Sequence, residues 1–304
     1  MREIAVINPS AGGGTAESTA QNTGKSVTIS DNKLKSTYAR TYYTKKEGDC
    51  RRIVAECLRE DPSTHFDIYG GDGSISDAVC GILDAGAGET ATFTICPAGS
   101  GNDTIKSLPT EPKGKIIPLD AIRVNDRHAI NMLNIGFDCN VVVSATKFKK
   151  MRFSGRTFAY VMGVATEFFK PFGEDFSITA ECIDGSTFEF EGSCLLCAIC
   201  NGQWCGGGFH NSPASDMSDG VLEMLLVKKT SRLNFIKLIG KYKDGTLLDP
   251  KTDLPPKGYE DIVIYRRIKS ITVSGTTQIC IDGEIAKTDC AKVEVVPHAV
   301  GYRI

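Results

Sequence analysis

The segment Phe66-Asp67-Ile68-Tyr69-Gly70-Gly71-Asp72-Gly73-Ser74 decides the fold of this chain. Its first four residues predict a short buried strand, and its glycines predict a sharp turn directly after that strand. The apolar residues that follow recur with the spacing of one helix face: Ile75, Ala78, Val79, Ile82 and Leu83. They predict an amphipathic helix over residues 74–85 that ends near Gly86. A strand, a glycine turn and a helix in this order are typical of α/β domains with a parallel sheet.

The same alternation extends over about the first 125 residues, as expected for consecutive βαβ units. Strands are predicted at residues 4–7, 66–69 and 91–96, and a helix at residues 50–58. Beyond this point the pattern changes to strand after strand, which predicts an antiparallel β-sandwich-like domain. Its expected strands are 177–183, 187–191, 221–228, 261–266, 270–274, 278–281 and 292–296.

One helical insert is expected within this β-rich part of the chain. It is marked by an aromatic stripe with helical spacing: Phe158, Val161, Met162, Ala165, Phe168, Phe169 and Phe172. The short basic stretch Lys147–Arg152 precedes it and has two interpretations. It either contacts an anionic lipid surface, at about 1 kcal/mol per basic residue, or is a solvated linker before a core helix.

Composition and charge exclude several classes of protein. The chain has 304 residues, of which 41% are hydrophobic and 24% charged, so it can bury a sizeable core. Its 35 basic and 37 acidic residues leave a formal net charge of −2, which argues against binding nucleic acid through phosphate neutralisation. No stretch reaches the ~18 to 20 apolar residues of a membrane span, and the first residues are too soon polar for a signal sequence. A cytoplasmic protein is therefore expected.

Twelve cysteines are present, and in a reducing compartment most of them are expected to be buried free thiols. Cys194, Cys197 and Cys200, with Cys205 further on, have a spacing similar to that of iron–sulfur ligands. However, residues 194–200 form an apolar run that predicts a buried strand, in which Cys197 would face away from Cys194 and Cys200. Buried strand cysteines are therefore the preferred interpretation.

Three glycine-rich turns follow the first three predicted strands, where open α/β sheets bind ligands. They are 8–14 (Asn-Pro-Ser-Ala-Gly-Gly-Gly), 70–74 (Gly-Gly-Asp-Gly-Ser) and 97–103 (Pro-Ala-Gly-Ser-Gly-Asn-Asp). Glycine lets backbone N–H groups approach an anion closely, and the helix after Gly73 adds its positive end. A single such turn could be a plain strand-to-helix reversal. Three such turns in equivalent positions after their strands, two of them with an acidic residue, predict phosphate binding.

These turns resemble those of the diacylglycerol kinase catalytic-domain family, bacterial lipid kinases that also resemble eukaryotic sphingosine and ceramide kinases. The turns match the family's first nucleotide loop, its GGDG[T/S] signature and its P-x-G-[T/S]-x-N-D loop, with serine at Ser74 and Ser100 where threonine is commoner. Later blocks match in order over nearly the whole chain: Asn134-Ile-Gly136-Phe137-Asp138, Asn201-Gly202, Gly206-Gly207-Gly208, Pro213-x5-Asp219-Gly220 and Asp282-Gly283-Glu284.

The resemblance implies a fold, a donor and an acceptor. The fold would be α/β plus β: a nucleotide-binding three-layer α/β domain over 1–124, a β-rich acceptor domain over 125–292, and a segment 293–304 that returns to the first domain. The donor would be ATP with Mg²⁺, and the acceptor a lipid alcohol such as diacylglycerol. The residues implied to bind the nucleotide are Asn8, Ser10, Gly12, Gly13, Gly14, Thr44, Gly70, Gly71, Asp72, Gly73, Ser74, Gly99, Ser100, Asn102 and Asp103.

Carboxylates are the candidates for the chemical step. Asp72 lies in a phosphate turn, where a bare carboxylate would repel the nucleotide, so we expect it to act through Mg²⁺ and its waters. Asp282 and Glu284 flank one glycine, and on a strand this spacing would turn both carboxylates to one side. The resemblance implies that this pair supplies the general base, and we favour Glu284 over Asp282. An ordinary hairpin turn is the alternative for Asp282-Gly283.

The resemblance also implies a second, structural Mg²⁺ site at Asp219, completed by backbone carbonyls near Asp216 and Val221. Hard oxygen ligands suit this ion, although a β-turn aspartate is the simpler interpretation.

Two other functions are compatible with the sequence. NAD kinases carry the same GGDG signature, so an NAD kinase-like enzyme is the alternative activity. A non-catalytic nucleotide-binding protein at the membrane surface is the alternative of another class, although five acidic side chains in matching positions argue against it. Peripheral contact with the inner face of the membrane would suit a lipid kinase. The acceptor lipid and the oligomeric state are not determined by the sequence, and none of the four histidines is assigned a role.

Overall fold

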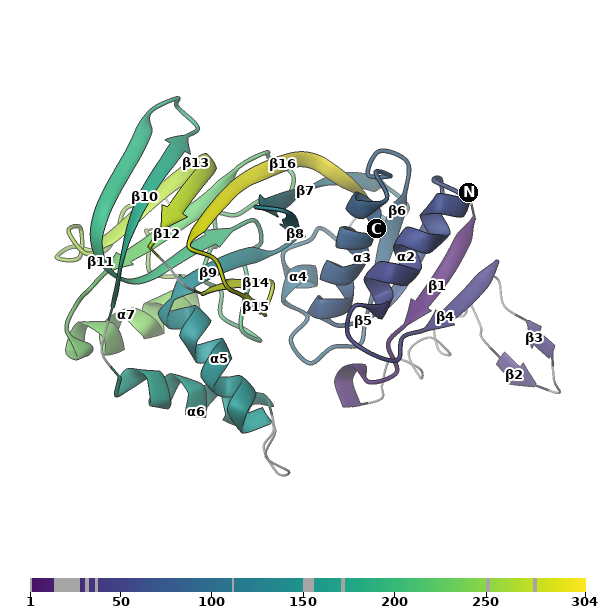
Figure 1. Cartoon of the computed structure of the whole chain (residues 1–304), viewed down its shortest axis with the longest axis horizontal. Coiled ribbons are helices and arrows are strands. Elements are labelled where there is room, and N and C mark those ends of the chain that lie inside the picture. The colour runs from purple at the N-terminus through teal and green to yellow at the C-terminus, as the bar shows by residue number, and fades with distance from the viewer. Residues whose placement is uncertain are drawn as a thin grey trace. The chain divides into compact units, whose positions relative to one another are not determined.

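The structure is a computed structural model that describes residues 2–13, 28–30, 33–35, 38–110, 112–149, 156–170, 173–249, 252–275 and 278–304. The chain divides into two compact units. Unit 1 comprises Met1–Ala121, Met217–Asp219 and Val296–Ile304, and unit 2 comprises Ile122–Asp216 and Gly220–Val295 (Figure 1).

Unit 1 is built on a parallel sheet. Strands β4 (Arg40–Tyr43), β1 (Glu3–Ile7), β5 (His65–Gly70) and β6 (Thr92–Pro97) lie side by side in this order. The last residues of β16 (Cys290–Arg303) pair with β6 in the same direction. Every residue of β5 is buried, including His65 and Asp67, which confirms the buried strand predicted from the sequence.

Two helices of unit 1 pack on each other and lie across the parallel strands (Figure 1). Helix α2 (Asp49–Glu60) buries Ile53, Val54, Cys57 and Leu58, and helix α3 (Asp72–Asp84) buries the apolar stripe that begins at Ile75. Both predicted helices are therefore confirmed, although α3 begins two residues earlier than expected. The shorter elements of this part of the chain are η1 (Ala11–Gly13), β2 (Thr28–Ser30), β3 (Lys33–Lys35), α4 (Asp103–Lys106), β7 (Ile116–Val124) and β8 (Arg127–Ala129).

Unit 2 is antiparallel, and its predicted hairpin across residues 184–186 is confirmed. Its strands are β9 (Met132–Gly136), β10 (Glu174–Cys182), β11 (Thr187–Cys200), β12 (Leu222–Lys228), β13 (Val263–Ser274), β14 (Ile279–Ile281), β15 (Glu284–Ala286) and the first half of β16. In two places, a pair of predicted segments forms one long strand. β11 joins the expected 187–191 strand to the apolar run 194–200, and β13 joins 261–266 to 270–274.

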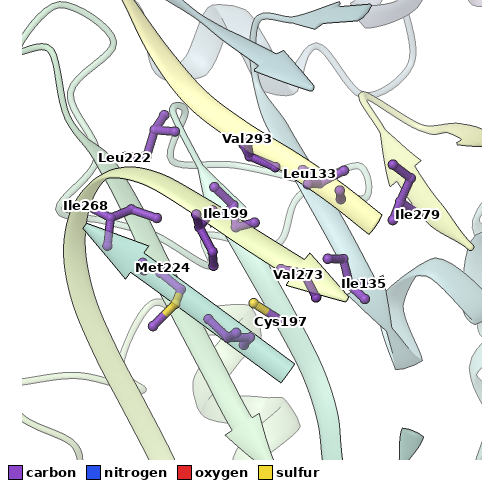
Figure 2. Packing of buried hydrophobic residues seen from close by; sticks show 14 of the residues in the cluster. Leu133, Ile135, Cys197, Ile199, Leu222, Met224, Ile268, Val273, Ile279 and Val293 are labelled. Carbon is purple, nitrogen blue, oxygen red and sulfur yellow. The ribbon is translucent and has the colours of Figure 1, made fainter. Parts of the chain in front are cut away.

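The two long strands explain how the sandwich closes. The first part of β11 pairs with β10, whereas residues 196–200 pair with both β12 and β9. Likewise, the first part of β13 pairs with β12, and its second part pairs with β10 and β16. Strands that pass from one sheet to the other enclose the core, where Leu133, Cys197, Ile199, Met224 and Val273 pack together (Figure 2).

The described residues of unit 2 include three helices, where the sequence predicted one. Helices α5 (Phe137–Lys149) and α7 (Arg232–Asp244) were not expected, and α6 (Arg156–Phe168) is the predicted insert. A second core cluster joins α5 and α7 to strands β11 and β12. Of the predicted aromatic stripe, Phe168 packs against this cluster, but Phe169 is 80% exposed because α6 ends before it. The side chains of Phe158, Val161 and Phe172 lie outside the described residues.

All twelve cysteines are described, and all are free thiols, nine of them buried. The expected alternation along the 194–200 run is only partly correct. Cys194 and Cys197 share one core cluster and Cys200 lies in the other, because a β-bulge between Cys194 and Leu196 shifts the register by one residue. Burial raises the pKa of the Cys194 and Cys200 thiols to about 12, so they stay protonated. Among the described residues, no cluster of cysteine, histidine or carboxylate side chains could hold a metal ion.

In the described part of the chain, the helices all fall short of the length and apolar character required to span a bilayer.

Candidate active site

Four neighbouring parallel strands end at one edge of the unit 1 sheet, and the predicted nucleotide residues follow them. The turn after β1 contains Asn8, the turn after β5 contains Gly70, and the turn after β6 contains Gly99; Thr44 follows β4. Backbone bonds continue the ladder into these turns: Asn8 N donates to Tyr69 O (2.9 Å), Thr44 N to Ile7 O (2.9 Å) and Ala98 N to Gly70 O (2.9 Å). The structure thus brings these residues together, except Gly14, which lies outside the described residues.

Two of the glycines are required by the close approach of the turns. A Cβ atom on Gly99 would lie 2.5 Å from the Cα atom of Gly71, and one on Gly71 would lie 3.0 Å from the Cα atom of Gly99. Any side chain at either position would push the second and third turns apart.

Side-chain hydrogen bonds tie the three turns to one another. Asn8 Nδ2 donates to Ser74 Oγ (3.1 Å), and Asn8 Oδ1 accepts from the backbone N–H of Ser10 (3.1 Å). Asp72 Oδ1 accepts from the backbone N–H of Thr104 (2.9 Å) and so links the second turn to the third. Asp72 is also the first residue of α3, where a negative charge is stabilised by the helix dipole.

The third turn ends in two polar residues with different environments. Asn102 has a left-handed backbone (φ 51°), and its buried Oδ1 atom has no hydrogen-bond partner among the described residues. Asp103 is buried, and its carboxylate accepts from Lys106 Nζ at 3.0 Å. An oxygen acceptor that the described residues leave unsatisfied at Asn102 indicates a place for a ligand donor or a cation.

A polar network beneath the second turn was not predicted from the sequence. The Tyr38 hydroxyl donates to Asp67 Oδ2 (2.6 Å) and lies 2.9 Å from the Tyr69 hydroxyl. Asp67 Oδ1 lies 3.1 Å from His65 Nε2, and His65 Nδ1 lies 2.7 Å from Thr92 Oγ1. Burial and the bond to Asp67 raise the pKa of Tyr38 far above its usual value, so the hydroxyl stays protonated. The network fixes β5 directly before Gly70.

The acidic pair of unit 2 has a different local geometry from the one expected. Asp282 and Gly283 form the two-residue turn of the β14–β15 hairpin, with φ angles of 46° and 90°. Such a turn suits Asp-Gly, because both positions have left-handed backbones. The strand-spacing argument for Asp282 and Glu284 is therefore wrong: only Glu284 lies on a strand, and it is exposed.

The Asp282 carboxylate is held by three backbone N–H groups of one segment. Oδ1 accepts from Asn131 (3.0 Å) and Met132 (2.9 Å), and Oδ2 accepts from Ile130 (2.8 Å). Asn201 Nδ2 in turn donates to Ile130 O (2.7 Å), so the predicted Asn201-Gly202 block supports the same segment. These three bonds to a carboxylate anchor the β14–β15 turn to residues 130–132.

Asp138, from the predicted 134–138 block, is a buried acid of unit 2. Its Oδ2 atom accepts from the Tyr242 hydroxyl at 2.7 Å. Burial raises its pKa to about 6, against the opposing effect of this hydrogen bond.

The predicted metal residues lie in the 216–221 loop. Asp216 and Asp219 are exposed, and between them Met217 O accepts from the backbone N–H of Asp120 (2.7 Å). Asp120 is fully buried, and its Oδ1 accepts from His298 N (2.8 Å). The loop offers carboxylate and carbonyl oxygens, which are the donors that Mg²⁺ prefers.

Comparison with known proteins identifies relatives of this chain in sequence and in fold. The sequence profile of the diacylglycerol kinase catalytic domain matches residues 2–135, and that of the YegS C-terminal NAD kinase beta sandwich-like domain matches residues 131–302. A solved structure described as a putative diacylglycerol kinase from Bacillus anthracis superposes with a TM-score of 0.70 at 21% identity, covering 99% of this chain and 96% of that one. This likeness shows a shared fold.

Curated relatives cover most of the chain. The "Probable lipid kinase YegS-like" of Alcanivorax borkumensis is 25% identical over 264 residues, 83% of this chain and 82% of that protein. The protein of the same name from Serratia proteamaculans is 28% identical over 275 residues (86% and 83%). The "Putative lipid kinase SAR0780" of Staphylococcus aureus is 27% identical over 278 residues (84% and 83%). The chain therefore belongs to the family defined by the YegS C-terminal NAD kinase beta sandwich-like domain, and its residues 2–135 match the diacylglycerol kinase catalytic domain, so at the level of the family it is a lipid kinase and hence a phosphotransferase.

Proposed function

We propose that this protein transfers the γ-phosphoryl group of ATP to the hydroxyl of a lipid alcohol such as diacylglycerol, with Mg²⁺ as the metal. The observation that carries the proposal is the packing of the three glycine turns at one edge of the parallel sheet. Gly71 and Gly99 touch backbone to backbone, which leaves N–H groups and the start of α3 for phosphate oxygens.

The nucleotide would be held by residues of unit 1. The hydrogen-bonded side chains of Asn8 and Ser74 support the first two turns, and Ser100 and the buried Asn102 Oδ1 atom lie in the third. Thr44 belongs to a rigid turn, because Asp49 Oδ2 accepts from the backbone N–H groups of Lys45 (2.8 Å) and Lys46 (3.2 Å). These bonds hold the pKa of Asp49 below its usual value.

The oxygen donors of the turns suit Mg²⁺, which when bound neutralises charge on the phosphate oxygens. Asp72 would hold it from the second turn, and Asp103 and Asn102 lie on the third turn, whose Thr104 N–H binds Asp72. A second, structural ion would use Asp219 with backbone oxygens at Asp216 and Val221.

Glu284 is the proposed general base. Its carboxylate is exposed on β15, whereas the Asp282 carboxylate already accepts three backbone hydrogen bonds. A base must take a proton from the acceptor hydroxyl as the phosphoryl group arrives, so the less saturated carboxylate is the better candidate. Asp282 would act as a positioning residue that fixes the hairpin on which Glu284 lies.

The acceptor class is tested by offering the protein γ-labelled ATP and Mg²⁺ with separate acceptors. These are diacylglycerol in mixed micelles, monoacylglycerol, undecaprenol, a sphingoid base and NAD. We expect label in an organic-extractable product of at least one lipid alcohol. Label that appears only in NADP would establish an NAD kinase-like enzyme instead.

Nucleotide binding without transfer to any acceptor of this panel would contradict the proposal and support a non-catalytic nucleotide-binding protein.

A further inference from the structure

Helix α7 has an outer face that combines exposed apolar side chains with lysines. Leu233 is 73% exposed and Ile236 is 56% exposed, and Gly240 continues the same stripe one turn later. The opposite face is fully engaged, because Phe235, Leu238 and Tyr242 lie in the second core cluster. The exposure of Leu233 and Ile236 is therefore not explained by the packing of unit 2.

Basic side chains flank this stripe on both sides. Lys237 and Lys241 lie along one edge and Lys243 along the other, by the helical spacing of their positions, and all three are exposed. Asp244, the last residue of α7, is the single acidic residue of the helix. An apolar stripe between rows of lysines is typical of helices that lie in the interface of an anionic bilayer, with the lysines reaching the headgroups.

The exposed end of α6 extends the same surface. The Arg232 guanidinium donates to the carbonyl oxygens of Phe168 (3.0 Å) and Lys170 (3.0 Å), which flank Phe169 in sequence. These bonds fix the backbone around Phe169 against the first turn of α7. Phe169 is the most exposed of the large hydrophobic residues that the structure describes, at 80%.

We propose that Phe169, Leu233 and Ile236, with Lys237, Lys241 and Lys243 around them, form a docking surface for an anionic lipid bilayer. We call it the α7 patch. We choose an anionic membrane as the binding partner because of its chemistry. It offers an apolar layer for the stripe and negative headgroups for the lysines. This inference rests on the proposed function, because a kinase of long-chain lipid alcohols must reach an acceptor held in a bilayer.

Co-sedimentation of the full chain with sucrose-loaded vesicles tests the patch. Two vesicle types are compared, phosphatidylcholine alone and equal parts of phosphatidylcholine and phosphatidylglycerol. We expect the wild type to bind the anionic vesicles more tightly. The double variant Leu233→Ser/Ile236→Ser should weaken this binding by about tenfold or more. Lys237→Glu/Lys241→Glu should weaken vesicle binding about as much. Binding of the wild type should decrease as salt rises from about 0.1 M to about 1 M, whereas binding of this variant should not.

Leu254→Ser is the matched control. Leu254 is also highly exposed, at 61%, but lies outside the α7 patch, so this variant should bind vesicles like the wild type. All the replaced side chains are on the surface, so every variant should melt at the same temperature as the wild type. If a patch variant melts at a lower temperature, Phe169→Ser is used in its place. A wild type that binds neither vesicle, or patch variants that bind like Leu254→Ser, would overturn the inference.

Two further measurements separate this inference from the proposed function and from self-association. Patch variants should still phosphorylate a short-chain diacylglycerol in detergent micelles as fast as the wild type. A wild type that binds vesicles through the patch but phosphorylates no lipid alcohol would keep the docking surface and overturn the proposed function. If sedimentation velocity shows a dimer that Leu233→Ser/Ile236→Ser dissociates, and vesicle binding is unchanged, the patch binds a second copy and the inference is wrong.

Discussion

Asp72 and Asp282 both precede a glycine, yet their environments differ in a way that separates ligand chemistry from support of the fold. Asp72 begins helix α3 in a glycine turn, and one backbone N–H, that of Thr104, donates to its carboxylate. Asp282 forms a hairpin turn, and three backbone N–H groups of residues 130–132 donate to it. The same Asp-Gly pair thus accepts one backbone hydrogen bond at the start of a helix and three in a hairpin turn, where it supports residues 130–132.

The largest expected effect is that of Asp72→Ala on turnover. If Asp72 serves the metal and the phosphates, its loss should lower kcat by about 10³ or more. The stability should change by less than about 1 kcal/mol, because one hydrogen bond is lost at a partly exposed position. Steady-state kinetics and thermal melting of the same preparation check both expectations. A folded variant with wild-type turnover would remove Asp72 from the mechanism.

Asp282→Ala should show the opposite balance. It leaves three backbone N–H groups without their acceptor, so the free energy of unfolding should fall by roughly 3 kcal/mol. Denaturant unfolding measures this loss, and Glu284→Ala, which removes an exposed carboxylate from the same hairpin, is the matched control. Equal stability of the two variants would contradict the proposal that Asp282 supports the fold whereas Glu284 acts in the reaction.

Asp138 extends the comparison to an acid that the fold buries. Its pKa of about 6 in the folded protein lies above the usual 3.8, so the folded state binds this proton more tightly than the unfolded state does. The resulting stability is fully present below about pH 3.8 and is lost as the pH rises through about 6, by on the order of 3 kcal/mol. Asp138→Asn removes this dependence.

Denaturant unfolding of wild type and Asp138→Asn between pH 3.5 and 7.5, an interval chosen around both pKa values, measures the difference. The stability of the variant relative to the wild type should rise with pH. A constant difference across this range would show that the Asp138 carboxyl has an ordinary pKa.

Asp219→Ala tests the structural ion. A metal bound only by the folded chain stabilises it by about 2.7 kcal/mol when its concentration is a hundred times Kd. The wild type should therefore melt at a higher temperature as Mg²⁺ is added, and the variant should not respond. The Asp219 site would be rejected if both proteins respond alike.

Much of unit 1 was predictable because its signals are local. The turn after β5 contains Gly71, where a Cβ atom would lie 3.0 Å from the Cα atom of Gly99, and α3 follows from the spacing of Ile75 and its partners. The network of His65, Asp67 and Tyr69 was missed, although these residues alternate along β5 and so share one face. The partners Tyr38 and Thr92, however, come from other parts of the chain and are not identified by the pattern of β5.

Unit 2 was harder to predict because its decisive contacts are distant in sequence. The three donors to Asp282 come from residues 150 to 152 positions earlier in the chain. No local pattern identifies them. Helix α7, by contrast, had a usable signal: Phe235, Leu238 and Tyr242 recur with helical spacing between a Ser231 cap and Gly245.

The register shift in β11 is a third kind of miss. A strict alternation placed Cys197 opposite Cys194, but a bulge near Leu196 put both in one core cluster. A bulge depends on how the strand pairs with its neighbours, here β12 and β9, and not on its own residues.

The central claim is that Glu284 accepts the proton of the acceptor hydroxyl while the glycine turns of unit 1 hold ATP. Single-turnover transfer to a short-chain diacylglycerol, measured beside ATP affinity for wild type and Glu284→Gln, tests it most directly. We predict equal ATP affinity and transfer that is slower by about 10² or more in the variant. Transfer at the wild-type rate by Glu284→Gln, with ATP bound equally well, would contradict the claim.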